Sequence, residues 1–161
     1  MDFLWSPWRS HYVASTKKSL GCVFCQISQS SRDIDPTSFV LWRGEFNFII
    51  LNLFPYTTAH LLIVPFEHTA DLSNLDKSIS DEMMDLAKQT QRAITEEYHP
   101  DGFNLGMNQG SAAGAGIAGH LHLHLLPRWN GDANFMTTIG ETRVLPESLE
   151  NTYRKLVRHF Q

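Results

Sequence analysis

Hydrophobic residues recur along this chain at two spacings, and each spacing predicts a different kind of element. Short apolar runs bounded by turn residues indicate strands. The runs are residues 39–43, 46–52, 60–65 and 103–108. Turn-forming residues separate the first three runs, at residues 43–45 and 54–56. Strands that follow one another through such short turns favour antiparallel pairing.

Two later segments carry helical spacing instead. Residues 80–99 place side chains three and four positions apart, at Met84, Ala87, Gln91, Ile94 and Tyr98. Either Ser78 or Ser80 is a candidate N-cap, and Pro100 with Gly102 ends the segment. Residues 146–160 predict a shorter helix, with an apolar side formed by Leu149, Tyr153, Leu156, Val157 and Phe160. Residues 28–37 are rich in Ser and Asp and predict a loop. Hairpin-like strands combined with two helices indicate an α+β domain on an antiparallel sheet.

Length, charge and composition narrow the class of protein. At 161 residues the chain is long enough for one well-packed domain, which we expect to span residues 1–161. A net charge of −4 argues against general nucleic-acid binding. Trp5, Pro7 and Trp8 interrupt any signal-peptide pattern, and no apolar run approaches the length of a membrane span. We therefore expect a cytoplasmic protein with no membrane partner.

The most informative pattern is the alternation of histidine and leucine at residues 120–124. In a strand, alternate side chains point to one face about 6.5 to 7 Å apart, so His120, His122 and His124 would share a face. Leu121, Leu123 and Leu125 would then point to the core. Buried imidazoles need hydrogen-bond partners, which makes such a row costly without a purpose. A metal site, a nucleophile with supporting groups and a partly exposed polar face all remain open.

A glycine- and alanine-rich stretch, residues 108–119, leads directly into these histidines. Small residues allow backbone N–H groups to approach a ligand closely, and successive N–H groups can bind an anion. Taken alone, the stretch is typical of a flexible connector. Beside a row of histidines it indicates a phosphate-binding loop.

The two cysteines of the chain, Cys22 and Cys25, have the Cys-x-x-Cys spacing of half a zinc site. In a reducing compartment this spacing favours a metal or redox pair over a structural disulfide. A zinc site needs two further ligands. A thioredoxin-like redox pair and two simple buried thiols are the alternatives.

Together these motifs resemble the histidine triad family. Residues 120–126 match its signature of three alternating histidines followed by apolar residues. Residues 48–65 are similar to the family's first hairpin, with Asn52 and His60 at its polar positions. The segments at residues 4–9 and 127–136 resemble the branch of dinucleoside polyphosphate phosphorylases and hydrolases. The likeness covers roughly residues 4–150.

The resemblance implies a five-stranded antiparallel sheet with two main helices. It divides the chain into a lead-in with Cys-x-x-Cys (1–27), a core (38–128) and a C-terminal extension (129–161). It also implies a homodimer in which two sheets join. We expect a small-molecule nucleotide as the substrate.

The resemblance further implies covalent chemistry through a nucleotidyl-histidine. His122 would attack the α-phosphorus of a nucleotide, supported by His124 and His60. The implied substrate-binding residues are the ribose contact Asn52, the phosphate contact Asn108 and the loop residues Ser111, Gly114, Ala115 and Gly116. Trp129, which follows the histidine strand, would border the nucleotide site. The loop is one residue longer than in the simplest relatives and lacks a matching Gln or Ser, so backbone groups or Ser111 would have to replace that contact.

Some relatives, and the related galactose-1-phosphate uridylyltransferases, complete a zinc site from the Cys-x-x-Cys pair and two histidines. The matching positions here are His68 and His120, which would join Cys22 and Cys25 around a structural zinc.

The implied activity is cleavage of a dinucleoside polyphosphate such as diadenosine tetraphosphate. Water as the acceptor makes the enzyme a hydrolase, and inorganic phosphate makes it a phosphorylase. A nucleoside phosphoramidase is a further alternative within the family. Two alternatives do not use this chemistry. One is a hydrolase with a catalytic metal ion held by the three histidines, and the other is a non-catalytic nucleotide-binding protein.

Overall fold

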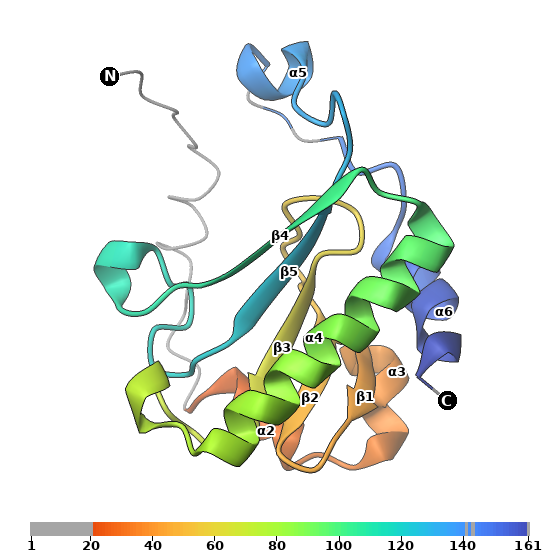
Figure 1. Ribbon diagram of the computed structural model, residues 1–161. Helices are drawn as coiled ribbons and strands as arrows, with labels where there is room; N and C mark the ends of the chain where they lie inside the picture. The colour runs from red at the N-terminus through yellow and green to blue at the C-terminus, as the bar shows by residue number, and fades with distance from the viewer. Residues whose placement is uncertain (1–20, 141, 143, 161) are drawn as a thin grey trace.

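The computed structural model describes residues 21–140, 142 and 144–160, so the lead-in residues Trp5 and Trp8 lie outside the described residues. A single sheet and one long helix dominate this part of the chain (Figure 1). The strands are β1 (Val40–Arg43), β2 (Asn47–Leu51), β3 (Leu61–Pro65), β4 (Gly102–Met107) and β5 (Leu123–Arg128). The helices are α2 (Val23–Ser28), α3 (Asp35–Ser38), α4 (Lys77–Tyr98), α5 (Phe135–Thr138) and α6 (Leu149–Leu156). The described residues also form four short 3-10 helices, η1 (Arg32–Ile34), η2 (Leu72–Asn74), η3 (Ser111–Ala113) and η4 (Val157–His159).

The sheet has the order β1-β2-β3-β5-β4, and every neighbouring pair is antiparallel. Strand β5, which follows the histidines, therefore lies inside the sheet, between β3 and β4. Strand β4 is an edge strand. The prediction of an α+β protein with a five-stranded antiparallel sheet and two main helices is confirmed.

The two faces of the sheet bury different clusters. On one face, α4 and α6 cover a large core that includes Leu61, Leu123 and Leu125 (Figure 1). On the other face, Phe24 of α2 packs against Phe48, Ile50, Leu62 and Val64 of β2 and β3. His124 is opposite Leu62 in the register of β5 with β3, so the even-numbered residues of β5 share this second face. We call it the histidine face.

The turn between β1 and β2 is fixed by a carboxylate from α4. Glu82 accepts hydrogen bonds from the backbone N–H groups of Glu45 and Phe46 and from the buried side chain of Asn47. A Cβ added at Gly44 would lie 2.6 Å from an oxygen of Glu82, which explains why glycine occupies this position. The contact joins α4 to the hairpin that carries β2, and so helps hold the sheet under its covering helix.

Several predicted boundaries were wrong. The segment predicted as a loop, residues 28–37, forms η1 and the start of α3, because Ser31 caps η1 and Pro36 lies in the first turn of α3. The long helix begins at Lys77 after Asp76, so neither Ser78 nor Ser80 is its N-cap. Met84 is 47% exposed, and the buried face of α4 instead carries Ile79, Met83, Leu86, Ala87, Thr90, Ala93 and Ile94.

The predicted C-terminal helix and histidine strand are also shorter than expected. Helix α6 begins at Leu149, after Ser148 accepts the N–H of Asn151, and a 3-10 turn follows it. Strand β5 begins at Leu123, three residues after the predicted start at His120. None of the described helices is long and apolar enough to cross a membrane.

Candidate active site and metal-ligand cluster

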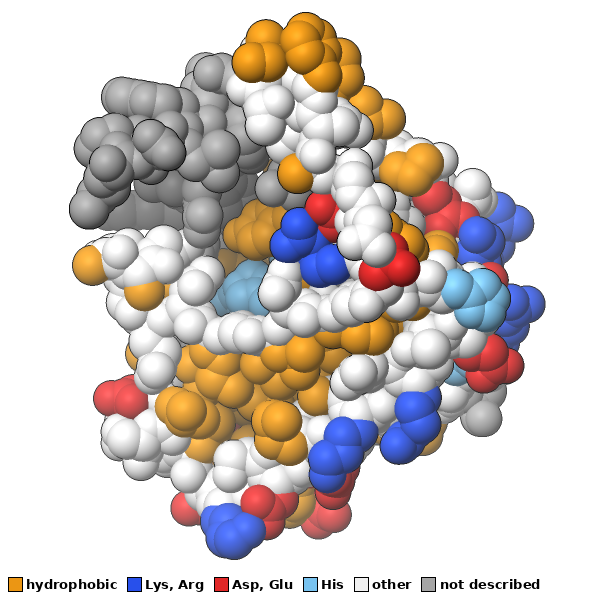
Figure 2. Space-filling model, turned by 45° about the horizontal axis from the view of Figure 1, so that its top comes forward, with side chains coloured by type: hydrophobic (Ala, Val, Ile, Leu, Met, Phe, Trp, Pro, Cys, Tyr) orange, Lys and Arg blue, Asp and Glu red, His pale blue; other side chains and the backbone are white. Residues whose placement is uncertain are grey.

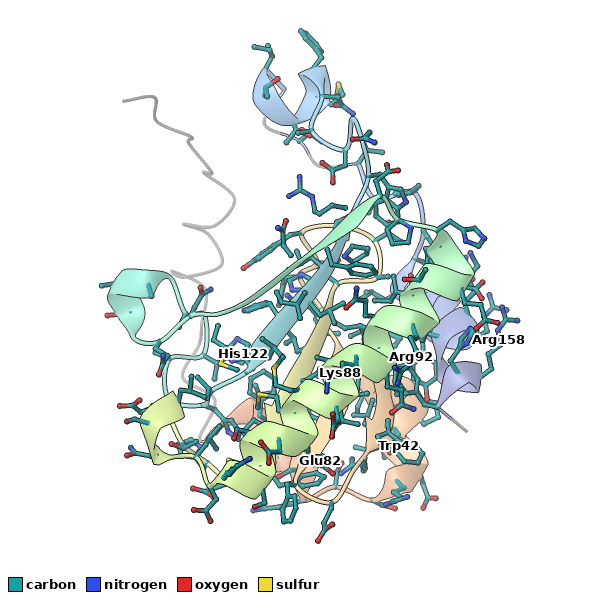
Figure 3. All side chains as sticks on the ribbon, viewed as in Figure 1. Trp42, Glu82, Lys88, Arg92, His122 and Arg158 are labelled. Carbon is teal, nitrogen blue, oxygen red and sulfur yellow. The ribbon has the colours of Figure 1, made fainter. Side chains whose placement is uncertain are left out.

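The three histidines of the signature are all buried, although only His124 lies within β5. The exposed fractions of His120, His122 and His124 are 0%, 5% and 8%. Leu121, Leu123 and Leu125 are buried between them, so the predicted alternation is present even where the chain is not yet a strand. His122 lies beside the edge strand β4 (Figure 3).

A hydrogen bond and a ring contact fix the orientation of His122. Its Nδ1 lies 2.8 Å from the carbonyl oxygen of His120, and since a carbonyl only accepts, Nδ1 must donate. The ring of Phe24 packs on it with centroids 5.2 Å apart. Burial lowers the pKa of His122, which favours the neutral ring. In that ring the single proton is on Nδ1, and Nε2 carries a lone pair.

His60 and His124 form a directed chain of hydrogen bonds. The backbone N–H of Tyr56 donates to Nδ1 of His60 over 3.1 Å, so the proton of a neutral His60 is on Nε2. That Nε2 lies 2.9 Å from Nδ1 of His124. His124 therefore accepts at Nδ1 and carries its own proton on Nε2. The ring centroids of His122 and His124 are 4.8 Å apart, so the two imidazoles are direct neighbours.

Asn52 supports this chain from the end of β2. Its amide nitrogen lies 3.2 Å from Nδ1 of His60, and its oxygen accepts the N–H of Phe54. The structure therefore brings Asn52 to the histidines, where its amide nitrogen contacts the ring of His60. Its predicted contact with a ribose stays a prediction.

Tyr56 is a neighbour of the site that the sequence did not identify. Its ring stacks on His124 with an interplanar angle of 16° and packs on His60 at 4.7 Å. Its backbone fixes the tautomer of His60, as described above. The only local signal was its place in the Phe-Pro-Tyr turn, which indicates a loop and nothing more.

The glycine loop leaves the sheet at the end where His122 lies. Met107 of β4 is opposite Leu123 of β5, so Asn108 follows directly beside the histidine segment. Ser111 begins the turn η3, and Gly114 ends it with φ of +81°, a conformation that favours glycine. Gly114 and Ala115 are half-buried, whereas Gly116 and Ser111 are exposed. The binding roles of these residues remain predictions.

Trp129 lies at the other end of β5, away from His122. Its indole N–H donates to the carbonyl of Tyr98, and its side chain lines a cavity whose wall includes Tyr56. Trp129 is thus separated from the three histidines along the strand, and its predicted contact with substrate stays a prediction.

Cys22, Cys25, His68 and His120 come together at the opposite end of the histidine face. Their ligand atoms all lie within 4.8 Å of one another. Nδ1 of His120 is 3.3 Å and 3.6 Å from the sulfurs of Cys22 and Cys25, and Nδ1 of His68 is 3.1 Å from Cys25. These separations match the edge of a tetrahedral zinc site, which is about 3.5 Å for sulfur and nitrogen ligands.

His120 is oriented by a second hydrogen bond. Its Nε2 lies 2.9 Å from the carbonyl oxygen of Pro65, to which it must donate, and this leaves Nδ1 as the ligand atom. His120 therefore belongs to the cysteine cluster, and it does not join His122 and His124 around one ion. Among the residues that the structure describes, this cluster is the one group of such side chains that could hold a metal.

Among the basic side chains that the structure describes, Lys88, Arg92 and Arg43 lie away from the histidines. Lys88 and Arg92 extend from the outer side of α4, on the other side of the sheet from His122 (Figure 3). Arg43 is bonded to Asp35 and to the carbonyls of Ile27 and Ser28, which fixes α2 and α3 to β1.

Comparisons with known proteins agree with this geometry. The HIT domain family model matches residues 35–131. A protein of Mycobacterium tuberculosis named AP-4-A phosphorylase is 38% identical over 98% of this chain and 83% of its own length. The crystal structure of a Zn-bound histidine triad family protein from Mycobacterium smegmatis has a TM-score of 0.69 and 30% identity, over 87% of this chain and 93% of that one. The chain therefore belongs to the histidine triad (HIT) family.

Proposed function

We propose that this enzyme cleaves dinucleoside polyphosphates such as diadenosine tetraphosphate through a covalent nucleotidyl-histidine on His122. The observation that carries the proposal is the orientation of His122, whose Nδ1–H is held by the carbonyl of His120. Its Nε2 lone pair attacks the α-phosphorus, a P–N bond forms, and the bond to the bridging oxygen breaks. A neutral buried imidazole is a good nucleophile at neutral pH.

His124 and His60 act on the leaving group in this scheme. Nε2–H of His124 donates to the bridging oxygen as negative charge develops on it. The bond from His60 fixes the tautomer that makes this donation possible. Backbone N–H groups near Gly114, Ala115 and Gly116, with Asn108 and Ser111, would stabilise the α-phosphate oxygens. Asn52 would bind the ribose while it supports His60.

The second step regenerates His122. An acceptor oxygen attacks the nucleotidyl phosphorus, and the P–N bond breaks. We propose inorganic phosphate as the acceptor, which would release ATP and ADP from diadenosine tetraphosphate. The support is the 38% identity with the mycobacterial protein named AP-4-A phosphorylase, which extends over 98% of this chain. Water in the same position would make the enzyme a hydrolase.

Product analysis separates these possibilities. Diadenosine tetraphosphate is incubated with the protein in the presence and absence of inorganic phosphate, with His122→Ala as the control. We expect ATP plus ADP only when phosphate is present. AMP plus ATP without phosphate would identify a hydrolase. No turnover in either condition would reject the dinucleotide substrate, and adenosine phosphoramidates would be tested next.

We further propose that Cys22, Cys25, His68 and His120 hold a structural zinc ion. The sulfur–nitrogen separations and the outer hydrogen bond to Pro65 both support the site. A zinc ion here would tie α2 to the residue two positions before the nucleophile. The ion would be closed off by four protein ligands and would take no part in the reaction.

A homodimer formed through β4 is also proposed. The described sheet ends at β4, and Leu105 on this strand is 44% exposed. Hydrophobic side chains gather on the side of the molecule that carries β4 and α4 (Figure 2). Pairing of two β4 strands would join two sheets and cover this area.

Light scattering during gel filtration tests the dimer. The wild-type protein is expected to elute with twice the mass of one chain. Leu105→Lys, which places a charge in the proposed contact, is expected to shift the protein toward the monomer at micromolar concentration. Met136→Lys, at an exposed position of α5 away from β4, serves as the control and should leave the mass unchanged. A monomeric wild-type protein would reject this proposal.

A further inference from the structure

A cavity of about 880 Å³ lies at the end of β5 opposite the metal-ligand cluster. Its walls come from the sheet, from the turn after β2 and from the C-terminal segment. They include Asn104, Leu126, Arg128, Tyr56, Thr137 and Glu147. The volume falls within the range of about 300 to 1,000 Å³ that is usual for small-molecule sites. The cavity does not include His122, so the reaction site alone does not explain it.

The cavity continues the histidine face. His124, Leu126 and Arg128 follow one another on this face of β5, each about 6.5 to 7 Å from the next. Tyr56 joins the two regions, because its ring stacks on His124 and also lines the cavity. A substrate whose phosphate is attacked by His122 can therefore extend past His124 and Tyr56 into this space.

The charges on the cavity wall argue for an uncharged occupant. The charged side chains among its lining residues form two ion pairs, Arg128 with Asp132 at 2.6 Å and Lys155 with Glu147 at 2.7 Å. The wall is thus neutral overall. A polyphosphate would meet no excess of positive charge here, whereas a nucleoside would bring no charge to be compensated.

Aromatic and polar side chains complete a surface suited to a base and a sugar. Tyr56, Tyr98 and Trp129 contribute rings, and the indole of Trp129 is held by its bond to the carbonyl of Tyr98. Asn104 and Asn134, with the hydroxyls of Thr57 and Thr58, provide hydrogen-bonding groups. Bases stack on such rings with little dependence on their identity, and amides or hydroxyls suit ribose and base edges.

We propose that this cavity binds the nucleoside of the leaving nucleotide, that is, the second nucleoside of a dinucleoside polyphosphate. The inference rests on the proposed function and adds a substrate subsite to it. It predicts a preference for substrates with a nucleoside at each end. It also gives Trp129 a binding role at a distance from the histidines.

Filling the cavity tests this subsite. Thr137 of α5 lines the cavity and is half-buried, whereas its neighbour Thr138 is exposed and does not line it. Thr137→Trp is expected to raise KM for diadenosine tetraphosphate about tenfold, because loss of a base-stacking contact weakens binding by about five- to 150-fold. Thr138→Trp is the matched control. With adenosine 5′-phosphoramidate, which has one nucleoside, both variants should behave as wild type.

Two results would overturn the subsite while leaving the proposed function intact. One is a Thr137→Trp variant with wild-type KM for diadenosine tetraphosphate. The other is an equal loss with both substrates. If the wild-type protein cleaves no dinucleotide, the proposed function fails, and binding to the His122→Ala variant then tests the subsite by itself.

This binding is measured by calorimetric titration. If His122→Ala binds diadenosine tetraphosphate more tightly than AMP, and adding Thr137→Trp abolishes the difference, the result supports the subsite. Equal binding of both nucleotides to His122→Ala rejects the subsite.

Discussion

Replacing His122 with alanine is expected to lower kcat for diadenosine tetraphosphate by about 10⁴-fold or more, as loss of an enzymatic nucleophile usually does. The physical reason is that no other described side chain presents an imidazole lone pair beside the Nε2–H of His124. The measurement is steady-state turnover at saturating substrate. His122→Asn, which keeps a polar side chain of smaller size, should lose activity to the same extent.

The matched control for this experiment is His99→Asn. His99 is exposed at the end of α4 and has a positive φ of 47°, which asparagine tolerates. Its replacement should leave kcat and KM unchanged. Activity of His122→Ala within a few-fold of wild type would exclude His122 as the nucleophile and favour a binding role for the protein.

Removing the proposed zinc ligands is expected to destabilise the protein more than it alters the chemistry. Cys22→Ser and Cys25→Ser should bind less than one zinc ion per chain by elemental analysis. Loss of about 4 kcal/mol of metal-dependent stability would lower Tm by about 10 °C in a protein of this size. Below the lowered Tm, kcat should stay within about tenfold of wild type, since the ion only positions the segment before His122.

A catalytic metal would behave differently. A chelator would then abolish turnover at once while Tm stayed nearly constant, and added zinc would restore the rate. The geometry opposes that outcome, because His120 faces the cysteines and is held there by the carbonyl of Pro65. A wild-type protein purified without metal but with an unchanged Tm would reject the structural zinc.

Local patterns predicted much of the fold because each one reports on a single element. The alternation at residues 120–125 predicted that the leucines point to the core, and Leu123 and Leu125 are indeed in the core under α4. The same pattern misplaced the strand start, since alternation continues through His120 and His122 before the ladder begins. Ser and Asp favour both loops and helix starts, which is why residues 28–37 were misread.

The metal cluster and the hydrogen-bond chain depend on contacts that no local pattern contains. Cys25 and His68 are 43 residues apart, and Cys22 and His120 are 98 apart. Only the family resemblance indicated that His68 and His120 lie beside the two cysteines. Tyr56 had no such indication, because its stacking on His124 depends on how β3 pairs with β5. Likewise, Glu82 fixes a distant hairpin turn that its position on a helix could not reveal.

Trapping the covalent intermediate tests most directly whether His122 is the nucleophile. The protein is mixed rapidly with diadenosine tetraphosphate in the absence of inorganic phosphate, quenched under alkaline conditions and digested for mass spectrometry. A nucleotidyl-histidine mechanism predicts one AMP group attached to the peptide that carries His122, absent in His122→Ala and lost when phosphate is added before the quench. An adduct on another residue, or turnover with no adduct in a single-turnover time course, would contradict it.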